Sequence, residues 1–391
     1  MWRIITGLAG AIVVIILAWL GIWFYAEMRL QQLVEAKINQ INAAGPQQVA
    51  YDRLETSSSP FVAGLTLINP RMKITVDPSE PPVVISADRI GAHISLLHPL
   101  TLHIVPSLRI TINDQDGPAV VAFAKARITE TLNPTIWRGN TLNPVASGNA
   151  VFSQINILAS NGSLEVAQID RLSLHETLNA RAGKDHAAIT LTQDMQNFRL
   201  SPLLSKLFGL PFNGQINSLT LSLAMSGPLN WQEIANQESA LQNDDQRTKM
   251  LLNHLHQWAE AGGHANGSLN IWVGPTRMRT GFMLRFDQQA QPEGKTEITA
   301  DNLDKFSNAL IASYPGLQGW VSVFQAELSP YISTTPQDGQ MLNLSVTYGP
   351  SGVFVGGKKT GTMPWLDWQA LLGAGSTPIL TPQTGSAGGA L

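Results

Sequence analysis

The chain has 391 residues, which allows one large domain or two of ordinary size. Its 25 Lys and Arg against 28 Asp and Glu give a net charge of −3, which excludes a chain-wide basic surface for nucleic acid. It has no cysteine, so disulfides, thiolate nucleophiles, iron–sulfur clusters and cysteine-bound zinc are excluded. Charged residues make up only 14% of the chain, and Ser, Thr, Asn, Gln and Gly replace most of them.

An uncharged apolar run of 23 residues, Ile4 to Ala26, lies near the N-terminus. As a helix rising about 1.5 Å per residue it would span roughly 34 Å, enough for the hydrocarbon core of a bilayer. Trp19, Trp23 and Tyr25 gather at its C-terminal end, as in the aromatic belt of a membrane interface. The run is longer than the apolar region of a signal peptide, and no A-x-A site follows it directly. We therefore expect residues 1–27 to form an uncleaved transmembrane anchor rather than a cleaved signal.

The charges beside this run do not decide its orientation, because Arg3 precedes it and Arg29 and Lys37 follow it. The absence of cysteine, together with strands rich in Asn, Ser and Thr, favours an exported domain. We therefore predict a single-pass protein of the inner (cytoplasmic) membrane whose C-terminal domain lies in the periplasm.

Helical periodicity continues through residues 28–44, where one stripe carries the apolar residues Leu30, Leu33, Val34, Ile38 and Ile41. Gly45-Pro46 then ends the pattern. We expect an amphipathic stalk helix that packs on the first strands, since the stripe is too short for a coiled coil.

From about Val49 onwards, apolar and polar residues alternate. The clearest runs are Met72–Asp77, Leu108–Asn113, Ile169–His175 (with one slip), Leu219–Ser226 and Leu342–Tyr348. Each run has one apolar and one polar face, which is typical of a half-solvated antiparallel sheet. The predicted fold class is mainly β with few helices (α+β). A long antiparallel sheet, curved or folded over, would fill residues 45–372 behind one N-terminal transmembrane helix.

Few segments have helical periodicity. Asp245–Ala261 and Asp301–Ala312 carry apolar residues at helical spacing, with Asp301 or Asn302 as the N-cap of the second, and a short turn is expected at Trp365–Leu372. Residues 373–391 are of low complexity and contain too little apolar surface to order themselves, so we expect a disordered tail.

One segment partly matches a phosphate-binding loop. Gly352 to Lys358 fits G-x-x-x-x-G-K, but Lys359 stands where that loop needs Ser or Thr, and no helical pattern follows. We therefore predict a glycine-rich hairpin at this position.

The histidines lack the spacing of a metal site. His93, His98 and His103 recur every five residues, which on one strand would place neighbours on opposite faces, and Pro99 would in any case break such a strand. His254 and His256 lie two apart on a predicted helix and do not face each other. Accordingly, no metal-binding residues and no cofactor are predicted.

Nucleophilic catalysis has no local motif either, because the chain has no G-x-S-x-G elbow. A dispersed triad through His175, His186 or His264 stays open, since triad members need not be close in sequence. Arg277 and Arg279 are interpreted as part of a polar strand face, not as a nucleic-acid site. No catalytic residues are assigned.

The distal half carries a recognisable order of strand, strand, P-x-G turn, strand and helix. It comprises Gly267–Pro275, Gly281–Asp287 and Gln291–Asp301, and it continues in Leu342–Tyr348, Gly352–Gly356 and Met363–Trp365. Together with Ser59–Phe61 and Leu65–Leu67, these segments resemble an alphaproteobacterial family of unknown function. The family usually has Gly-Phe-Pro near Ser59–Phe61, which this chain lacks.

The resemblance implies one N-terminal anchor and an exported β-rich domain, and it carries no assigned activity or catalytic residues. The strand pattern is also similar to AsmA-like envelope proteins, whose long curved sheets present an apolar groove to lipids. This second likeness is an analogy at the level of the fold.

We therefore expect a non-enzymatic, inner-membrane-anchored periplasmic protein that maintains the envelope or binds and transports lipid along an apolar sheet face. The expected partners are the membrane, through Ile4 to Ala26, and either phospholipid or another envelope protein, but not nucleic acid. Two alternatives remain: a scaffold that binds an envelope protein through a sheet edge, or an exported hydrolase with a dispersed triad. Alternation alone cannot tell a closed sheet from an open one.

Overall fold

The computed structural model describes residues 2–43, 47–57, 59, 61–75, 81–114, 117–138, 145–159, 162–179, 181–229, 233–234, 237, 241, 244–335 and 339–373. The side chains of residues 2–17, Asp114, Asp244 and Leu372 lie outside this description. Gly45-Pro46, where the stalk helix was predicted to end, also lies outside the described residues. The same holds for residues 374–391, which make up nearly all of the predicted tail.

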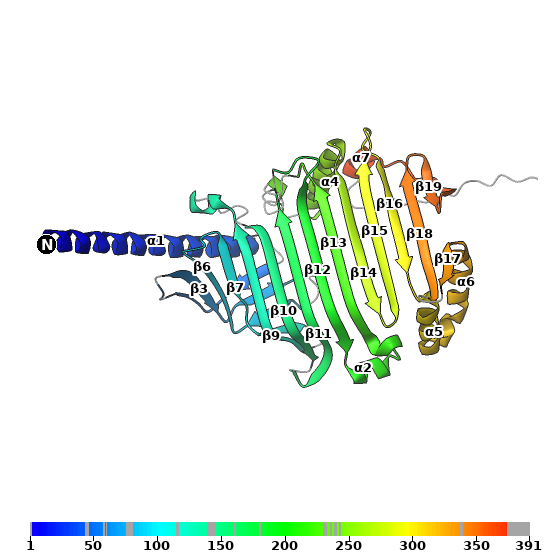
Figure 1. Ribbon diagram of the computed structural model, residues 1–391, viewed down its shortest axis with the longest axis horizontal. Coiled ribbons are helices and arrows are strands. Elements are labelled where there is room, and N and C mark those ends of the chain that lie inside the picture. Colours follow the sequence, from blue (N-terminus) through cyan, green and yellow to red (C-terminus); the bar gives the residue numbers. More distant parts are fainter. Residues whose placement is uncertain are drawn as a thin grey trace, which may run out of the picture.

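A single helix, α1 (Trp2–Ala43), contains both the predicted anchor and the predicted stalk (Figure 1). The helix enters the domain without a break between the two segments. Within the described part of the chain, none of the helices is long and apolar enough to cross a membrane. Much of Ile4 to Ala26 falls among the residues whose side chains are not described.

In the described ranges, twenty strands form one sheet, in which every pairing between them is antiparallel. The first ten are β1 (Gln47–Ala50), β2 (Arg53–Thr56), β3 (Val62–Ile68), β4 (Arg71–Ile74), β5 (Val83–Ala87), β6 (Arg89–Ser95), β7 (Thr101–Val105), β8 (Arg109–Asp114), β9 (Gly117–Leu132) and β10 (Val145–Ala159). The others are β11 (Leu164–Leu178), β12 (Ala187–Leu200), β13 (Gln215–Ser226), β14 (His264–Val273), β15 (Thr276–Phe286), β16 (Pro292–Ala300), β17 (Ile332–Thr335), β18 (Gly339–Gly349), β19 (Gly352–Val355) and β20 (Lys358–Gly361). The predicted class, mainly β with one large antiparallel sheet, is confirmed.

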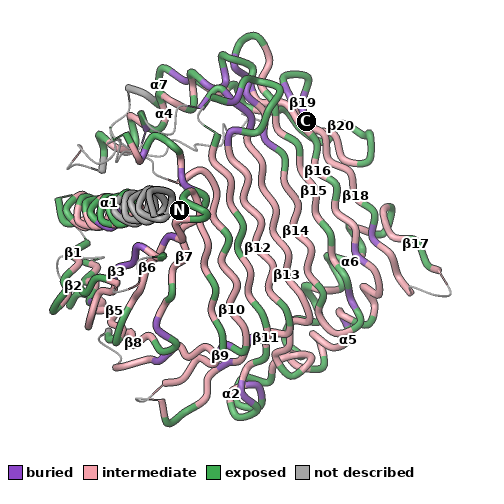
Figure 2. Tube along the Cα trace, turned by 60° about the vertical axis from the view of Figure 1, so that its left-hand side comes forward, coloured by how far each residue is buried: buried purple, intermediate pink, exposed green. Residues whose placement is uncertain are grey.

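Helices lie at the two ends of the long strands. Figure 2 shows β10 to β18 side by side, with α4 and α7 beyond one end of these strands and α2 and α5 beyond the other. The helices are α2 (Pro202–Leu207), α4 (Asp244–Glu260), α5 (Leu303–Ser313), α6 (Gln318–Leu328) and α7 (Trp368–Gly373), with 3-10 turns η1 (Pro134–Arg138), η3 (Pro211–Gly214), η4 (Pro315–Leu317) and η5 (Ser329–Tyr331).

The sheet divides into two arms at β9. The first part of this strand pairs with β8, and the sheet continues through β5, β4 and β1. The last part pairs with β7, and the sheet continues through β6, β3 and β2. One edge of β9 thus carries both arms, while its other edge pairs with β10 along most of its length.

The C-terminal half of α1 packs against these arms. Leu30 is buried in a cluster with Leu65 of β3, Ile94 of β6 and Leu132 of β9, and Leu33 and Val34 pack against it. The side chain of Asn42 exchanges two hydrogen bonds with the backbone of Val49 in β1, which ties the end of the helix to the other arm. The predicted packing of this stretch on the first strands is confirmed.

A transverse row of unpaired positions crosses the sheet from β9 to β13. The ladders omit Ala124, Gln154, Asp170, Asn197 and Asn217, although the residues on both sides of each are paired. Gln154 and Asn197 have left-handed backbones, with φ of 51° and 52°. The side chain of Asn197 donates to Asp170 at 2.9 Å. We call this row the crease.

The predicted helices match the structure closely. Asp245–Ala261 corresponds to α4, and Asp301–Ala312 corresponds to α5, where Asn302 occupies the N-cap position. The Asn302 side chain does not cap the helix but donates to the Pro275 carbonyl oxygen. The expected turn at Trp365–Leu372 overlaps α7, which ends one residue later at Gly373, whereas α2 and α6 were not predicted.

Candidate functional site

The apolar side chains of eight long strands share one face of the sheet. Because residues paired across an antiparallel ladder lie on the same face, the register defines this surface row by row. Three adjacent rows make up the surface, which we call the apolar face: Ala150, Leu174, Gln193, Leu221, Leu269, Thr280, Ile298 and Leu344; Phe152, Leu172, Met195, Leu219, Ile271, Met278, Ala300 and Leu342; and Gly148, Glu176, Leu191, Leu223, Gly267, Phe282, Thr296 and Val346.

The other side of the same strands is polar. One row there runs through Asn149, His175, Thr192, Ser222, Ser268, Gly281, Glu297 and Ser345. Hydroxyl and amide side chains fill most of this side, which accounts for the low charge of the chain. The two sides therefore differ sharply in their affinity for water.

The centre of the apolar face is not buried by any part of the chain that the structure describes. Leucines in a closed core are commonly buried completely, yet Leu219, Leu221 and Leu223 are each only partly buried. Leu174 is 36% exposed. The clusters of buried side chains lie instead at the borders, around α1, α4 and α7. The described residues therefore form an open apolar face.

Helix α4 covers the apolar face near one end of the strands. Trp258 is buried against Ala265 of β14, and its indole N–H donates to the Ser226 carbonyl oxygen at 2.8 Å. Its ring also meets that of Phe286 of β15 edge to face. Packing by α4 therefore covers this end of the apolar face, whereas no described segment covers the row that contains Leu221.

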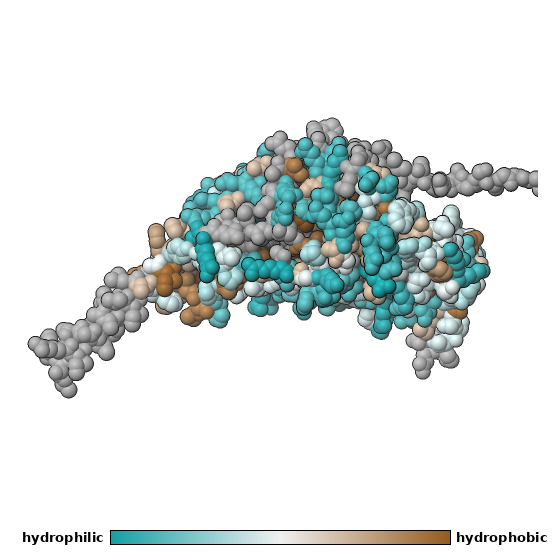
Figure 3. Space-filling view, turned by 90° about the horizontal axis from the view of Figure 1, so that it is seen from above, coloured by the Kyte–Doolittle hydropathy of each residue, from teal (hydrophilic) through white to brown (hydrophobic). Residues whose placement is uncertain are grey.

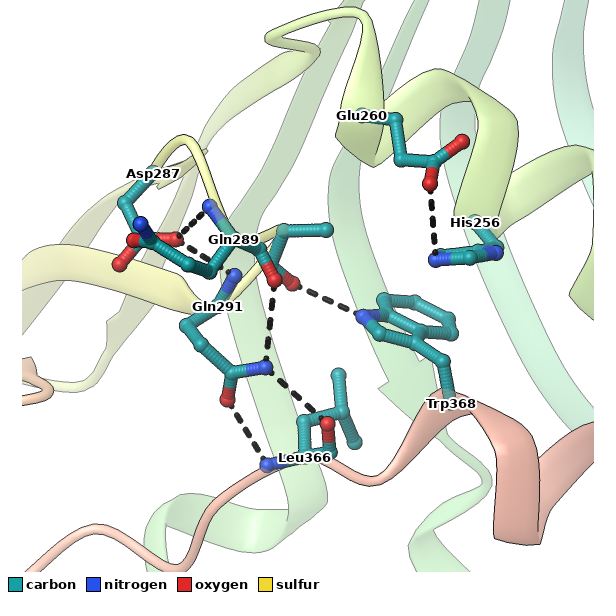
Figure 4. Close-up of polar contacts among 8 residues, drawn as sticks. His256, Glu260, Asp287, Gln289, Gln291, Leu366 and Trp368 are labelled. Carbon is teal, nitrogen blue, oxygen red and sulfur yellow. Dashed lines mark hydrogen bonds and ion pairs between the residues drawn. The ribbon is translucent and has the colours of Figure 1, made fainter.

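The C-terminal segment completes this border (Figure 4). The Gln291 side-chain amide donates to the Leu366 carbonyl oxygen at 3.0 Å and accepts from the Leu366 N–H at 2.8 Å. Trp368 of α7 donates its indole N–H to the Ala290 carbonyl oxygen and stacks on His256 of α4. These contacts join α7, α4 and the turn between β15 and β16 into one unit.

Two carboxyl groups lie at the β9 border of the apolar face, one of them the Glu176 of its third row. Glu130 of β9 and Glu176 of β11 are both register partners of Gly148, which stands between them on β10. A Cβ on Gly148 would lie 3.1 Å from Oε1 of Glu176, so that carboxylate lies over the glycine. Burial, and secondarily the charge of Glu176, raise the pKa of Glu130. This favours protonation and reduces the charge on an otherwise apolar surface.

A cleft of about 910 Å³ lies where the two arms separate. Its walls include Gly64 of β3, Gly91 of β6 and the segment from Val105 to Arg109. His93 also lines it and stacks on its cross-strand partner His103, with ring centroids 5.1 Å apart. Burial and the neighbouring His103 lower the pKa of His93. The volume lies in the range of small-molecule sites.

The histidine arrangement differs from the expectation drawn from spacing. His93 and His103 lie on two paired strands, β6 and β7, rather than on one strand, so their five-residue steps do not separate them. His98 lies in the connection between these strands. His254 and His256 have separate partners, Gln237 and Glu260. Among the described residues, no group of three or more His, Asp or Glu could hold a metal ion.

The other sequence candidates lie in ordinary structural positions. Gly352–Val355 and Lys358–Gly361 form the hairpin β19–β20, which confirms the predicted glycine-rich hairpin. Within the described part of the chain, no ring nitrogen of His175, His186 or His264 bonds to a Ser or Asp side chain; the Ser226 hydroxyl accepts from the backbone N–H of His264. Arg277 stacks over the ring of Trp272.

A second apolar surface lies at the far end of the molecule from the N-terminus. The exposed side chains of α6 and of the residue before it form it: Leu317, Trp320, Val323 and Phe324. We call these four residues the distal patch. Sequence reasoning missed α6, whose N-terminus has no capping side chain.

Comparison with known proteins gives one assignment. No curated protein and no solved structure matches the chain. The model of a bacterial family described as "uncharacterized protein conserved in bacteria (DUF2125)" matches residues 23–364, which include every strand of the sheet. The chain therefore belongs to this family of uncharacterized bacterial proteins.

Proposed function

We propose that the protein is a non-enzymatic, inner-membrane-anchored protein whose periplasmic domain binds phospholipid acyl chains on the apolar face and so serves envelope maintenance or lipid transport. The uncovered leucines of the long strands carry this proposal. Acyl chains would remove this surface from water, and each Å² of apolar area so buried contributes about 25 cal/mol.

The course of the sheet relative to α1 supports transport as well as binding. In Figure 1 the long strands run across the direction of α1, so successive strands lie progressively farther from the N-terminus. Eight ladder steps separate β9 from β18, which at a spacing of about 4.8 Å gives roughly 38 Å. With Ile4 to Ala26 in the membrane, the apolar face would lead away from the bilayer.

Lipid extraction from a purified fragment tests the proposal. The fragment should begin at Glu27 and not at residue 45, because Leu30 belongs to the core that α1 forms with the arms. Expressed in bacteria and purified without detergent, fragment 27–373 is expected to retain phospholipid that mass spectrometry identifies. A folded fragment free of lipid would refute the proposal.

Two substitutions on one strand provide the matched control. Leu221→Glu places a charge on the apolar face, whereas Ser222→Glu places it on the polar side of the same strand, β13. The first variant should lose most of its phospholipid and the second should keep it. Equal retention by both variants would mean that the lipid binds elsewhere.

A second candidate function, a scaffold for another envelope protein, draws support from the distal patch. Trp320 is 78% exposed there, and exposed aromatic clusters mark interaction sites. The sheet edges fit this role less well than we expected from the sequence. The edge strand β20 has four residues and carries Lys358 and Lys359, and short lysine-bearing edges discourage strand addition. Crosslinking in cells through position 320 should capture one dominant protein if the scaffold function holds.

A further inference from the structure

Large apolar side chains surround the point where α1 leaves the domain. On α1 itself Leu20, Ile22 and Phe24 are exposed, the last by 65%. Two loops of the arm that contains β3 and β6 add Phe61, 64% exposed, and Leu97, 75% exposed. Figure 3 shows the hydrophobic surface gathered beside the helix at this point. We call these five residues the collar.

The collar loops are attached to the helix by specific contacts. The Phe61 ring lies 5.9 Å from the Trp19 ring, and the Trp23 indole N–H donates to the Val62 carbonyl oxygen at 3.2 Å. The backbone N–H of Leu96 donates to the Phe61 carbonyl oxygen at 3.2 Å, which joins the two loops. Phe61 and Leu97 are therefore exposed in loops that specific contacts hold against α1 and against each other.

The helix presents different sides to the domain and to its surroundings. Ala26 and Leu30 are buried, and they share with Trp23 the side that faces the domain. Phe24 and Met28 are exposed on the remaining surface, whereas the partly exposed Tyr25 contacts the domain, its hydroxyl donating to the Trp137 carbonyl oxygen. The exposed side thus stays apolar for a full turn after the domain has begun to pack on the helix.

We propose that the collar lies in the lipid bilayer, with Phe61 and Leu97 inserted into its interface beside α1. The bilayer is the occupant that fits best because the collar is continuous with the uncharged run Ile4 to Ala26, and its aromatic residues suit the membrane interface. This inference rests on the proposed anchoring of that run.

Insertion at three places would fix the orientation of the domain. A single helix leaves a domain free to tilt, whereas Phe61 and Leu97 add contacts to the side of α1. The arm formed by β7, β6, β3 and β2 would then meet the membrane surface. Its apolar side, which carries Leu65 and Ile94 and packs on α1, continues through β9 into the apolar face.

Single-cysteine labelling of the full chain tests the collar, because the chain has no cysteine of its own. The variants Phe61→Cys and Leu97→Cys each receive an environment-sensitive fluorophore. Ile22→Cys reports on anchoring, and Trp320→Cys is the control at an exposed apolar position far from the collar. Each labelled protein is reconstituted into vesicles of phosphatidylcholine and phosphatidylglycerol, with and without nitroxide-labelled lipid.

Nitroxide lipid should remove most of the emission of the probes at positions 22, 61 and 97 and little of that at position 320. Quenching at position 22 without quenching at 61 and 97 would show that the two collar loops stay outside the bilayer, which overturns the inference while leaving the anchor in place. Absence of quenching at all of these positions would overturn the anchoring and the collar together. Equal quenching at 61, 97 and 320 would also overturn the inference, since the whole domain would then lie on the membrane.

Discussion

The rings of Phe123 and Phe152 lie 5.1 Å apart, although the register pairs Phe123 with Ile155 and Phe152 with Ala126. In a regular strand Phe123 and Ala126 would point to opposite sides of the sheet. The contact places both rings on one side, so alternation reverses at the crease. The reversal keeps the apolar face continuous past Ala124 and Gln154.

The crease gives a testable effect on stability at Gln154. A left-handed backbone costs a residue with a Cβ roughly 1–2 kcal/mol, a cost that glycine avoids. Gln154→Gly should therefore raise the free energy of unfolding by roughly 0.5–1 kcal/mol. Gln154→Val should lower it by about 1–3 kcal/mol, because a β-branched residue fits this backbone poorly. Urea unfolding of the purified chain in mild detergent measures both changes.

The same substitution at a regular position supplies the control. His175 lies on the polar side of β11 and is exposed. Glycine there should lower the free energy of unfolding by about 0.5–1 kcal/mol, since it adds chain entropy without relieving strain. If glycine at position 154 were as destabilising as at position 175, the crease would not be a strained feature.

Alternation predicted the strands well because each side of the sheet meets a different environment. The runs at Leu219–Ser226 and Leu342–Tyr348 correspond to β13 and β18. The slip within Ile169–His175 is the point at which Asp170 enters the crease. In the sequence of one strand, the slip is only an interruption of the alternation. It can be recognised as part of the crease only when the neighbouring strands are aligned, because their unpaired positions lie in the same transverse row.

Other features could not be predicted because they depend on contacts between distant segments. The division of the sheet at β9 follows from two different partners of one strand. The stacking of His93 on His103 requires a hairpin that spacing alone did not suggest. Whether the apolar face is open depends on what packs over Leu221, which no local pattern contains.

The carboxyl pair should make stability depend on pH. Burial and Glu176 raise the pKa of Glu130 above its ordinary value of 4.5, so the folded chain holds this proton where the unfolded chain has lost it. The free energy of unfolding should therefore fall as pH rises from 4.5 through the raised pKa. Glu130→Gln should flatten that part of the profile and stabilise the chain at pH 7.

The control for the carboxyl pair is Glu297→Gln. This residue lies exposed on the polar side of β16, beside Lys295, and its replacement should leave the slope between pH 4.5 and pH 7 unchanged. Unfolding in urea at a series of pH values compares the variants. Identical slopes in the Glu130→Gln variant and the original chain would contradict the assigned role of the pair.

Two replacements of Trp368 separate packing from hydrogen bonding at the C-terminal border. Trp368→Ala removes a side chain that is 7% exposed and should lower the free energy of unfolding by about 3–5 kcal/mol. Trp368→Phe keeps an aromatic ring but loses the bond to the Ala290 carbonyl oxygen, at a cost of about 1 kcal/mol plus some packing. Thermal unfolding measures both, and limited proteolysis should cut the Ala variant first near Met363. Equal stability of the Ala and Phe variants would show that packing of the ring does not hold this segment.

Leu30 and Met28 test whether α1 belongs to the fold or merely leads to it. Leu30 is 2% exposed and lies in the cluster with Leu65 and Ile94, whereas Met28 is exposed. Leu30→Ala should therefore lower the free energy of unfolding by about 2–5 kcal/mol. Met28→Ala should change it by less than about 0.5 kcal/mol in detergent solution. Circular dichroism during thermal unfolding makes the comparison. If both variants unfold at the same temperature as the original chain, α1 does not stabilise the arms through its buried side chains. The helix would then only connect the domain to the membrane and would not be part of the fold.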